Sequence, residues 1–139
     1  MILADTNVFS ALMRTPREAV VVRWLDSQPH ASVWISSISI LEIRFGLEIM
    51  SSGRKRSALT AAFEHLVTNI LDSRIALFDA AAAEEAAKVM AVRRARGRPG
   101  EQRDTMIAGI ALANRATIAT RNQRHFDDLQ CQVVDPWSF

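Results

Sequence analysis

Three acidic residues of this chain occupy positions suited to binding a metal ion: Asp5, Glu42 and Asp104. If their carboxylates converge to about 5 Å, each pair repels by roughly 3 kcal/mol at an effective dielectric near 20, or on the order of 10 kcal/mol in all. Protonation relieves part of this repulsion, and a divalent cation relieves more of it. Mg²⁺ and Mn²⁺ prefer ligand sets made of oxygen. The chemistry expected of such a site is phosphoryl transfer, in which metal ions polarise the phosphate and lower the pKa of a bound water, so that no side-chain nucleophile is required.

Two of these acidic residues also have a purely structural interpretation. Glu42 falls in one stripe with Ile38, Phe45 and Ile49 on a predicted helix, which predicts an apolar environment for its carboxylate. A charge in such a place needs either a buried salt bridge or a cation. Asp104 opens another predicted helix, where a carboxylate is also an ordinary first-turn charge. Position alone therefore leaves both interpretations open.

Other common catalytic signatures are missing. The three histidines are scattered and the single cysteine, Cys131, has no partner, so no zinc-ligand spacing is present. The motifs of a serine nucleophile elbow and of a phosphate-binding loop are also absent. We expect His125 to pack or cap a short turn and Cys131 to be a small buried residue of a strand.

Short apolar runs alternate with helical patterns along the whole chain. Strands are predicted over Met1–Ala4, Ser32–Ser36, Ile75–Phe78, Ala116–Thr120 and Cys131–Val134. Helices are predicted over Val8–Met13, Glu18–Asp26, Ser37–Met50, Arg54–Asn69, Ala80–Arg96 and Arg103–Asn114, with a short turn over Asn122–Phe126. This order predicts an α/β fold, a mainly parallel sheet of four to five strands with helices on both faces.

The predicted topology brings polar residues from distant parts of the chain together. Asp5 follows the first strand, and Thr120, Arg121 and Asn122 follow the strand that ends at Thr120. Open α/β sheets bind ligands in the crevice at the carboxyl ends of their strands. If these two strands are neighbours, both polar clusters face one crevice.

Composition is typical of an ordinary globular chain. The 139 residues are 49% apolar and 23% charged, which excludes disorder and predicts one domain over 1–139 with a single core. The single cysteine cannot form an internal disulfide. No apolar run is long enough for a membrane span and no signal peptide is evident, so we expect a cytoplasmic protein without membrane contact.

The positive charge of the chain is concentrated in one stretch. Fifteen of the 17 cations are arginine, and Lys88–Arg103 holds six cations against one acid, Glu101. Within it, Arg93, Arg94, Arg96 and Arg98 are candidates for phosphate contacts, and we add Arg121 from the crevice. Such runs are also common on plain solvated faces.

The same residues, taken in order, resemble a known family. The matching segments are Ile2–Val8, Ser36–Gly46, Gly97–Pro99 followed by Asp104–Ala108, Ala119–Asn122 with His125-Phe126, and the closing Asp135–Trp137. They resemble PIN-domain ribonucleases, specifically the VapC-type toxins of prokaryotic toxin–antitoxin pairs and their FitB-like branch. The likeness spans nearly the whole chain.

This resemblance implies a fold, an activity and partners. It implies a three-layer α/β/α sandwich and an endoribonuclease in which Asp5, Glu42 and Asp104 bind Mg²⁺ or Mn²⁺ and Thr120 holds a carboxylate or water. It also implies a homodimer with a basic groove for RNA, with tRNA as one candidate class. A cognate antitoxin would block the site and carry operator DNA binding for the pair.

One position departs from the family pattern. Asn122 stands where the family often has a fourth acidic residue, and an amide orients water without adding charge. A second metal should therefore bind more weakly. This departure keeps a catalytically weak PIN-like binding module open as an alternative. A metal-dependent DNA nuclease is a second alternative, because the site chemistry does not read the 2′-hydroxyl.

Overall fold

Five short parallel strands form one sheet in the spatial order β3-β2-β1-β4-β5. The computed structural model describes all 139 residues. The strands are β1 (Ile2–Ala4), β2 (Val33–Ser36), β3 (Ile75–Ala76), β4 (Thr117–Ala119) and β5 (Val133–Val134). Strand β1 lies at the centre, so the first residues of the chain form the middle of the sheet.

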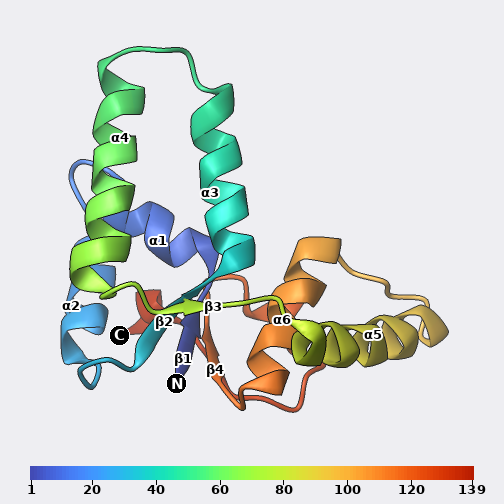
Figure 1. Cartoon of the computed structure of the whole chain (residues 1–139). Helices are drawn as coiled ribbons and strands as arrows, with labels where there is room; N and C mark the ends of the chain where they lie inside the picture. The colour runs from blue at the N-terminus through green and yellow to red at the C-terminus, as the bar shows by residue number, and fades with distance from the viewer.

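Six helices cover the two faces of this sheet (Figure 1). They are α1 (Thr6–Met13), α2 (Ala19–Ser27), α3 (Ser37–Ile49), α4 (Arg54–His65), α5 (Ala80–Ala95) and α6 (Gln102–Ala113). Helices α1 to α4 pack on one face, and α5 and α6 pack on the other. The arrangement is the three-layer α/β/α sandwich that the alternating pattern predicted.

Each strand contributes side chains to two separate cores, because successive side chains of a strand point to opposite faces of the sheet. In β1, Leu3 is buried with α5 and α6, whereas the next residue, Ala4, is buried with α1 to α4. In β4, Ile118 and Ala119 divide in the same way. The sheet is therefore buried on both faces, which explains why its strands are almost entirely apolar.

The carboxyl ends of β1 and β4 meet at one edge of the sheet. Ala4 is in register with Ala119, and the backbone N–H of Asp5 donates to the carbonyl oxygen of Ala119 at 2.9 Å. The residues that follow the two strands, Asp5 and Thr120, are therefore adjacent, as the predicted topology required. A buried serine, Ser36, ends the neighbouring strand β2 at the same edge.

Most element boundaries agree with the sequence prediction to within two residues, and two features differ. The predicted helix over Arg54–Asn69 is α-helical only to His65 and continues as a π-helical turn over Leu66–Ile70. The predicted apolar stripe of α3 is not buried as a whole, because Phe45 and Ile49 are 57% and 70% exposed. The buried face of α3 instead contains Ile43 and Leu47.

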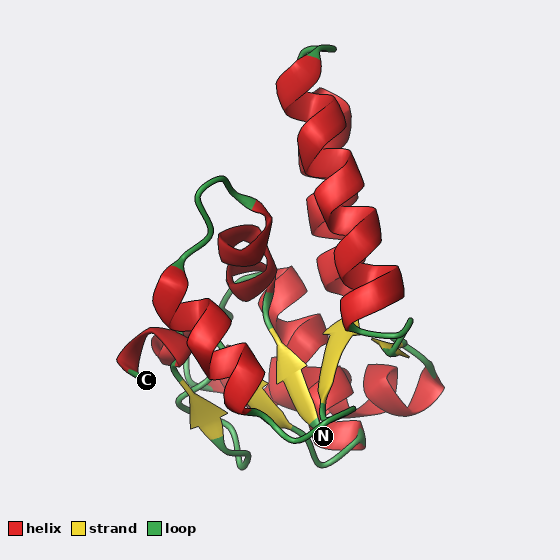
Figure 2. Ribbon diagram, turned by 90° about the vertical axis from the view of Figure 1, so that its left-hand side faces the viewer, coloured by secondary structure: helices red, strands yellow, loops and turns green.

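Helices α3 and α4 form an antiparallel hairpin that projects beyond the sheet (Figure 2). Because the hairpin extends past the other helices, the outer turns of α3 have neighbours only on the side of α4. This explains the exposure of Phe45 and Ile49. None of the six helices is both long enough and apolar enough to cross a membrane.

Candidate metal and nucleic-acid site

Asp5 is fixed by the ends of two neighbouring strands and the start of α1. Its Oδ1 accepts from the backbone N–H of Thr6 at 2.8 Å, so the carboxylate caps α1. Its Oδ2 accepts from the Thr120 hydroxyl at 2.8 Å, and the Asn7 amide lies 3.4 Å away. The carboxylate is almost fully buried, and that burial raises the pKa of Asp5 above its ordinary value despite the hydrogen bond from Thr120.

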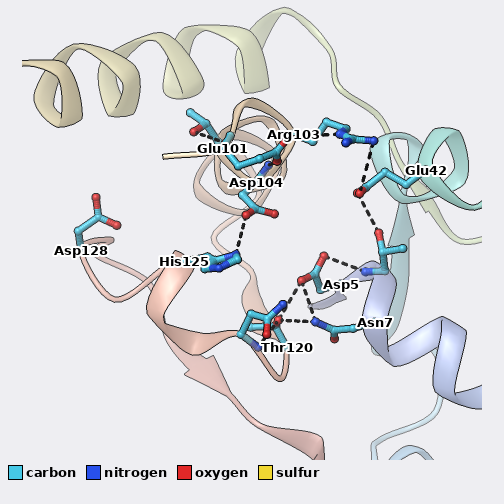
Figure 3. A network of polar contacts seen from close by, with 12 residues as sticks. Asp5, Asn7, Glu42, Glu101, Arg103, Asp104, Thr120, His125 and Asp128 are labelled. Atoms are coloured by element: carbon cyan, nitrogen blue, oxygen red, sulfur yellow. Dashed lines mark hydrogen bonds and ion pairs between the residues drawn. The ribbon is translucent and has the colours of Figure 1, made fainter. Parts of the chain in front are cut away.

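Glu42 reaches the same edge of the sheet from the first half of α3. The Thr6 hydroxyl donates to Oε1 of Glu42 at 2.9 Å, and it also lies 3.1 Å from the Ser39 hydroxyl. Figure 3 shows Glu42 together with Asp5 and Asp104. Burial raises the pKa of Glu42 as well. Its only ion pair is a 3.9 Å contact with Arg103, a side chain that is 45% exposed. Glu42 is therefore not part of a buried salt bridge.

Asp104 lies in the first turn of α6, and a different acid caps that helix. Glu101 accepts from the backbone N–H of Asp104 at 2.9 Å, which leaves the Asp104 carboxylate free to point away from the helix. Nδ1 of His125 lies 2.7 Å from Oδ2 of Asp104. Burial raises the pKa of Asp104, and the charge of nearby Glu101 adds to this rise, while His125 opposes it.

The three carboxylates line one open pocket of about 380 Å³, which we call the carboxylate pocket. Asn122 and His125 line it too, so it lies at the carboxyl ends of β1 and β4. The negative charges repel one another, since Asp104 raises the pKa of Asp5 and both raise the pKa of Glu42. No three Asp, Glu, His or Cys side chains are close enough to form a complete ligand cluster.

This donor set fits a hydrated divalent cation better than a tightly caged one. Mg²⁺ keeps several of its waters and is usually bound through only one or two carboxylates. A pocket with three separated carboxylates and no sulfur ligand matches that behaviour. A cation would also relieve the burial and repulsion that raise the three pKa values.

Comparison with known proteins identifies the family. The model of the PIN domain matches residues 2–130 of the chain. The chain belongs to the PIN-domain family. This PIN domain is 32% identical to "VapC ribonuclease Y4jK" of Sinorhizobium fredii over 137 residues, covering 99% of this chain and 98% of the relative. It is also 32% identical to "Toxin FitB" of Neisseria gonorrhoeae, covering 99% of both chains.

A solved structure supports the same relationship. The crystal structure of FitAcB from Neisseria gonorrhoeae contains a chain that matches this PIN domain with a TM-score of 0.89 and 32% identity, covering 100% of both chains. The resemblance inferred from the motifs is thus confirmed at the level of the family and the fold.

Several residues of the site have roles that the sequence did not reveal. His125 was expected to pack or cap a turn, yet its ring contacts Asp104. Thr6 and Asn7 follow Asp5 at the start of α1, and their side chains hold Glu42 and contact Asp5 and Thr120. Apart from the contact of Asn7 with Asp5, these contacts join positions that are far apart in sequence, so only the repeated occurrence of polar types beside the acidic residues could have indicated them.

The expected arginine groove needs one correction. Arg93 is not available to a substrate phosphate, because its side chain is only 6% exposed and binds Asp128 through two 2.8 Å contacts. It also donates to the Thr105 hydroxyl at 2.9 Å. Arg93 therefore holds α5 and α6 of this PIN domain together. Arg94, Arg96, Arg98 and Arg121 are exposed and form no ion pair.

Proposed function

We propose that this protein is a Mg²⁺- or Mn²⁺-dependent endoribonuclease that acts as the toxin of a toxin–antitoxin pair. The observation that carries the proposal is the convergence of Asp5, Glu42 and Asp104 on one pocket, where burial raises the pKa of each. The names of the relatives, a VapC ribonuclease and the toxin FitB, support the same assignment.

Asp5, Glu42 and Asp104 are the residues that would hold the cation. When bound, a divalent cation polarises the scissile phosphate, lowers the pKa of a coordinated water and offsets charge on the leaving oxygen. The chain itself supplies the placement of the ligands. Thr120 and the Thr6 backbone hold the two oxygens of Asp5, and the Thr6 hydroxyl holds Glu42.

His125 orients the third ligand. Its 2.7 Å contact with Oδ2 of Asp104 sets the direction of that carboxylate and leaves Oδ1 without a side-chain partner. Partners of metal ligands typically affect metal affinity or activity by about 10- to 100-fold. His125 is thus a positioning residue of this site.

RNA is the proposed substrate, and tRNA is one class to be tested. Phosphate contacts supply most sequence-independent affinity for nucleic acid, and Arg121 lines the carboxylate pocket where it can reach a phosphate. DNA cleavage by the same chemistry is the alternative that parallel digests of RNA and DNA distinguish. Cleavage of both would show that the 2′-hydroxyl is not read.

A groove beside the site suits an antitoxin. Helices α1, α3 and α4 enclose a groove of about 730 Å³, and half of its lining residues are hydrophobic. Thr6 and Glu42 line both this groove and the carboxylate pocket. A partner with an apolar segment in the groove would therefore reach the catalytic residues. We propose that a cognate antitoxin binds here and that operator DNA is bound through it.

A homodimer is proposed from the exposed apolar strip of α3. Leu41, Phe45 and Ile49 are more than half exposed and are spaced four residues apart, so they form one row. A Phe45→Glu, Ile49→Lys variant should be monomeric in light scattering where the parent protein is dimeric. A monomeric parent protein would refute this part of the proposal.

Asn122 is the one observation that favours a weaker function. Its side chain lines the carboxylate pocket without adding a charge, which is compatible with a binding module that has lost catalysis. Metal binding separates the two functions, because the ribonuclease requires it.

The deciding experiment is cleavage of a fluorescent RNA panel by antitoxin-free protein with Mg²⁺, with Mn²⁺ and with EDTA. We expect metal-dependent cutting that is lost in Asp5→Asn and Asp104→Asn, with unchanged circular dichroism. A tRNA pool serves as a further substrate. If folded, antitoxin-free protein cuts no RNA with any metal, or if both variants cut normally, the proposed function is wrong.

A further inference from the structure

A second pocket adjoins the carboxylate pocket and contains no hydrophobic residue in its lining. It has a volume of about 270 Å³ and lies between the end of α5, the loop Gly97–Gly100 and the turn that follows β4. Asp104 and His125 line both pockets, so the two are neighbours. We call this second site the arginine pocket, because Arg96, Arg98 and Arg124 line it.

The arginine pocket is built on a rigid floor. Buried Arg93 binds Asp128 at 2.8 Å with two nitrogens and donates to the carbonyl oxygen of His125 at 2.8 Å. The loop is folded against the same residue, since the Arg98 backbone N–H donates to the carbonyl oxygen of Arg93 at 2.9 Å. Gly100 has φ +69°, and a Cβ there would lie 3.1 Å from Nη1 of Arg93. The pocket is therefore preformed.

Two of the four acidic residues that line the pocket are paired with arginines, whereas its outer arginines form no ion pair. Asp128 is paired with Arg93, Asp104 with His125, and Glu101 with Arg103. Arg96, Arg98 and Arg124 form no ion pair, and Asp127 is the one acid of the lining without a partner. Because His125 offsets the charge of Asp104 only when its ring is protonated, three free guanidinium groups face at most two uncompensated carboxylates, those of Asp127 and Asp104. An excess of positive charge remains in either case.

We propose that the arginine pocket binds a phosphate of the RNA strand other than the one that is cut. The guanidinium fork matches phosphate geometry, and no hydrophobic residue lines the pocket. This inference rests on the proposed ribonuclease function. If a remote phosphate is bound here, an RNA must extend past the cleaved bond on the side of this pocket to bind tightly.

The test compares two variants of equal charge. Arg96→Gln/Arg98→Gln/Arg124→Gln removes the pocket's free arginines. Arg17→Gln/Arg23→Gln/Arg115→Gln removes three exposed arginines that form no ion pair and line neither pocket. Binding to single-stranded RNA is measured by anisotropy in EDTA, in the Asp5→Asn background, over a range of salt. Thermal unfolding of both variants checks that the fold is kept.

We expect the pocket variant to bind RNA 10- to 100-fold more weakly at low salt. A plot of the logarithm of the association constant against the logarithm of the salt concentration has a negative slope. Each phosphate contact that is lost should reduce the magnitude of this slope by about 0.7. The control variant should lose less than threefold. In wild-type background the pocket variant should raise KM for RNA far more than it lowers kcat.

A scan with neutral methylphosphonate linkages locates the phosphate. The parent protein should lose affinity when a particular remote linkage is neutralised, and the pocket variant should be insensitive at that same linkage. If the pocket variant binds RNA as tightly as its parent, or if the control variant loses as much affinity, the arginine pocket does not bind an RNA phosphate. Cleavage of RNA by the wild-type protein would be unaffected by that result. Absence of RNA cleavage by wild type would overturn the proposed function itself, and this inference with it.

Discussion

The hydroxyl of Thr120 donates to Oδ2 of Asp5 across two adjacent parallel strands, from 115 residues away in the sequence. Thr120 is fully buried, and its oxygen also accepts from the Asn122 backbone N–H at 3.0 Å and from the Asn7 amide at 3.2 Å. The Thr120 side chain therefore links Asp5, a proposed metal ligand, to Asn7 and Asn122.

Replacing this hydroxyl should cost activity more than stability. Thr120→Val keeps the volume of the side chain but removes the hydrogen bond to Asp5, so we expect a 10- to 100-fold loss of kcat/KM, the range typical of residues that support metal ligands. Thr120→Ser keeps the hydroxyl and should retain most of the activity. Steady-state cleavage of one RNA substrate measures both. Equal activities of the valine and serine variants would remove Thr120 from the mechanism.

The carboxylates should make the metal-free protein less stable as pH rises. Because the pKa of Asp5 is raised in the folded state, the native protein holds a proton that the unfolded chain, with an ordinary pKa of 3.8, has already lost. Stability therefore falls as pH rises from about that value through the folded pKa, and Glu42 and Asp104 act in the same direction. Glu101 and Asp128 have lowered pKa values, so their stabilisation is lost only at lower pH.

Asp5→Asn tests this account by melting curves in EDTA. The variant should have a higher Tm than wild type at neutral pH and a flatter profile above the ordinary pKa of 3.8. Added Mn²⁺ should raise the Tm of wild type and have much less effect on the variant. A variant that is destabilised in EDTA at neutral pH would show that Asp5 is mainly a structural cap of α1.

Asn122→Asp restores the acidic type that the family often has at this position. The side chain is exposed at the carboxylate pocket, so an added carboxylate loses little hydration. Its negative charge strengthens the attraction of the pocket for a cation. We expect Mn²⁺ to bind at least tenfold more tightly, which corresponds to about 1.4 kcal/mol. Isothermal titration gives the affinity and the number of ions. Unchanged affinity and stoichiometry would show that this position does not face the ion.

The contact between α5 and α6 depends on Gly109. A Cβ at this position would collide with the carbonyl oxygen of Ala82 and lie 2.7 Å from the Cβ of Ala86. We therefore expect Gly109→Ala to destabilise the fold by about 1–3 kcal/mol, the usual cost of overpacking. Gly46→Ala in α3 is the matched control, because nothing lies within 4 Å of the added atom.

The control should be neutral or stabilising by up to about 1 kcal/mol, since alanine favours helix over glycine. Chemical denaturation of the two variants compares them directly. A Gly109→Ala variant as stable as Gly46→Ala would mean that the two helices separate easily.

The alternation of short apolar runs with helical patterns along the sequence was enough to predict the layers of this fold. The apolar strands and the helical spacing follow local rules, and the strands and helices of the structure agree with them. The stripe of α3 was mispredicted because amphipathic spacing shows which residues share a face and not whether a neighbour covers it. The projection of the hairpin depends on packing between distant elements.

The site was predictable in its acids and unpredictable in its connections. Asp5 follows a strand and Asp104 opens a helix, and local sequence patterns identify both positions. The contact of His125 with Asp104 and the burial of Arg93 depend on how the turn after β4 packs against α6, which no local pattern encodes. Arg93 looked like its exposed neighbours because a charge run does not show which member turns inward.

The central position of β1 has a consequence for biosynthesis. Strand β1 is made first, yet its partner β4 begins only at Thr117, and Asp5 acquires its hydrogen bond only once Thr120 is present. A nascent chain that has not yet emerged from the ribosome as far as β4 has an incomplete sheet and scattered carboxylates. Under the proposed function, the ribonuclease site is complete only after Thr120 has been added, so the message that encodes the protein would not be cut by its own unfinished product.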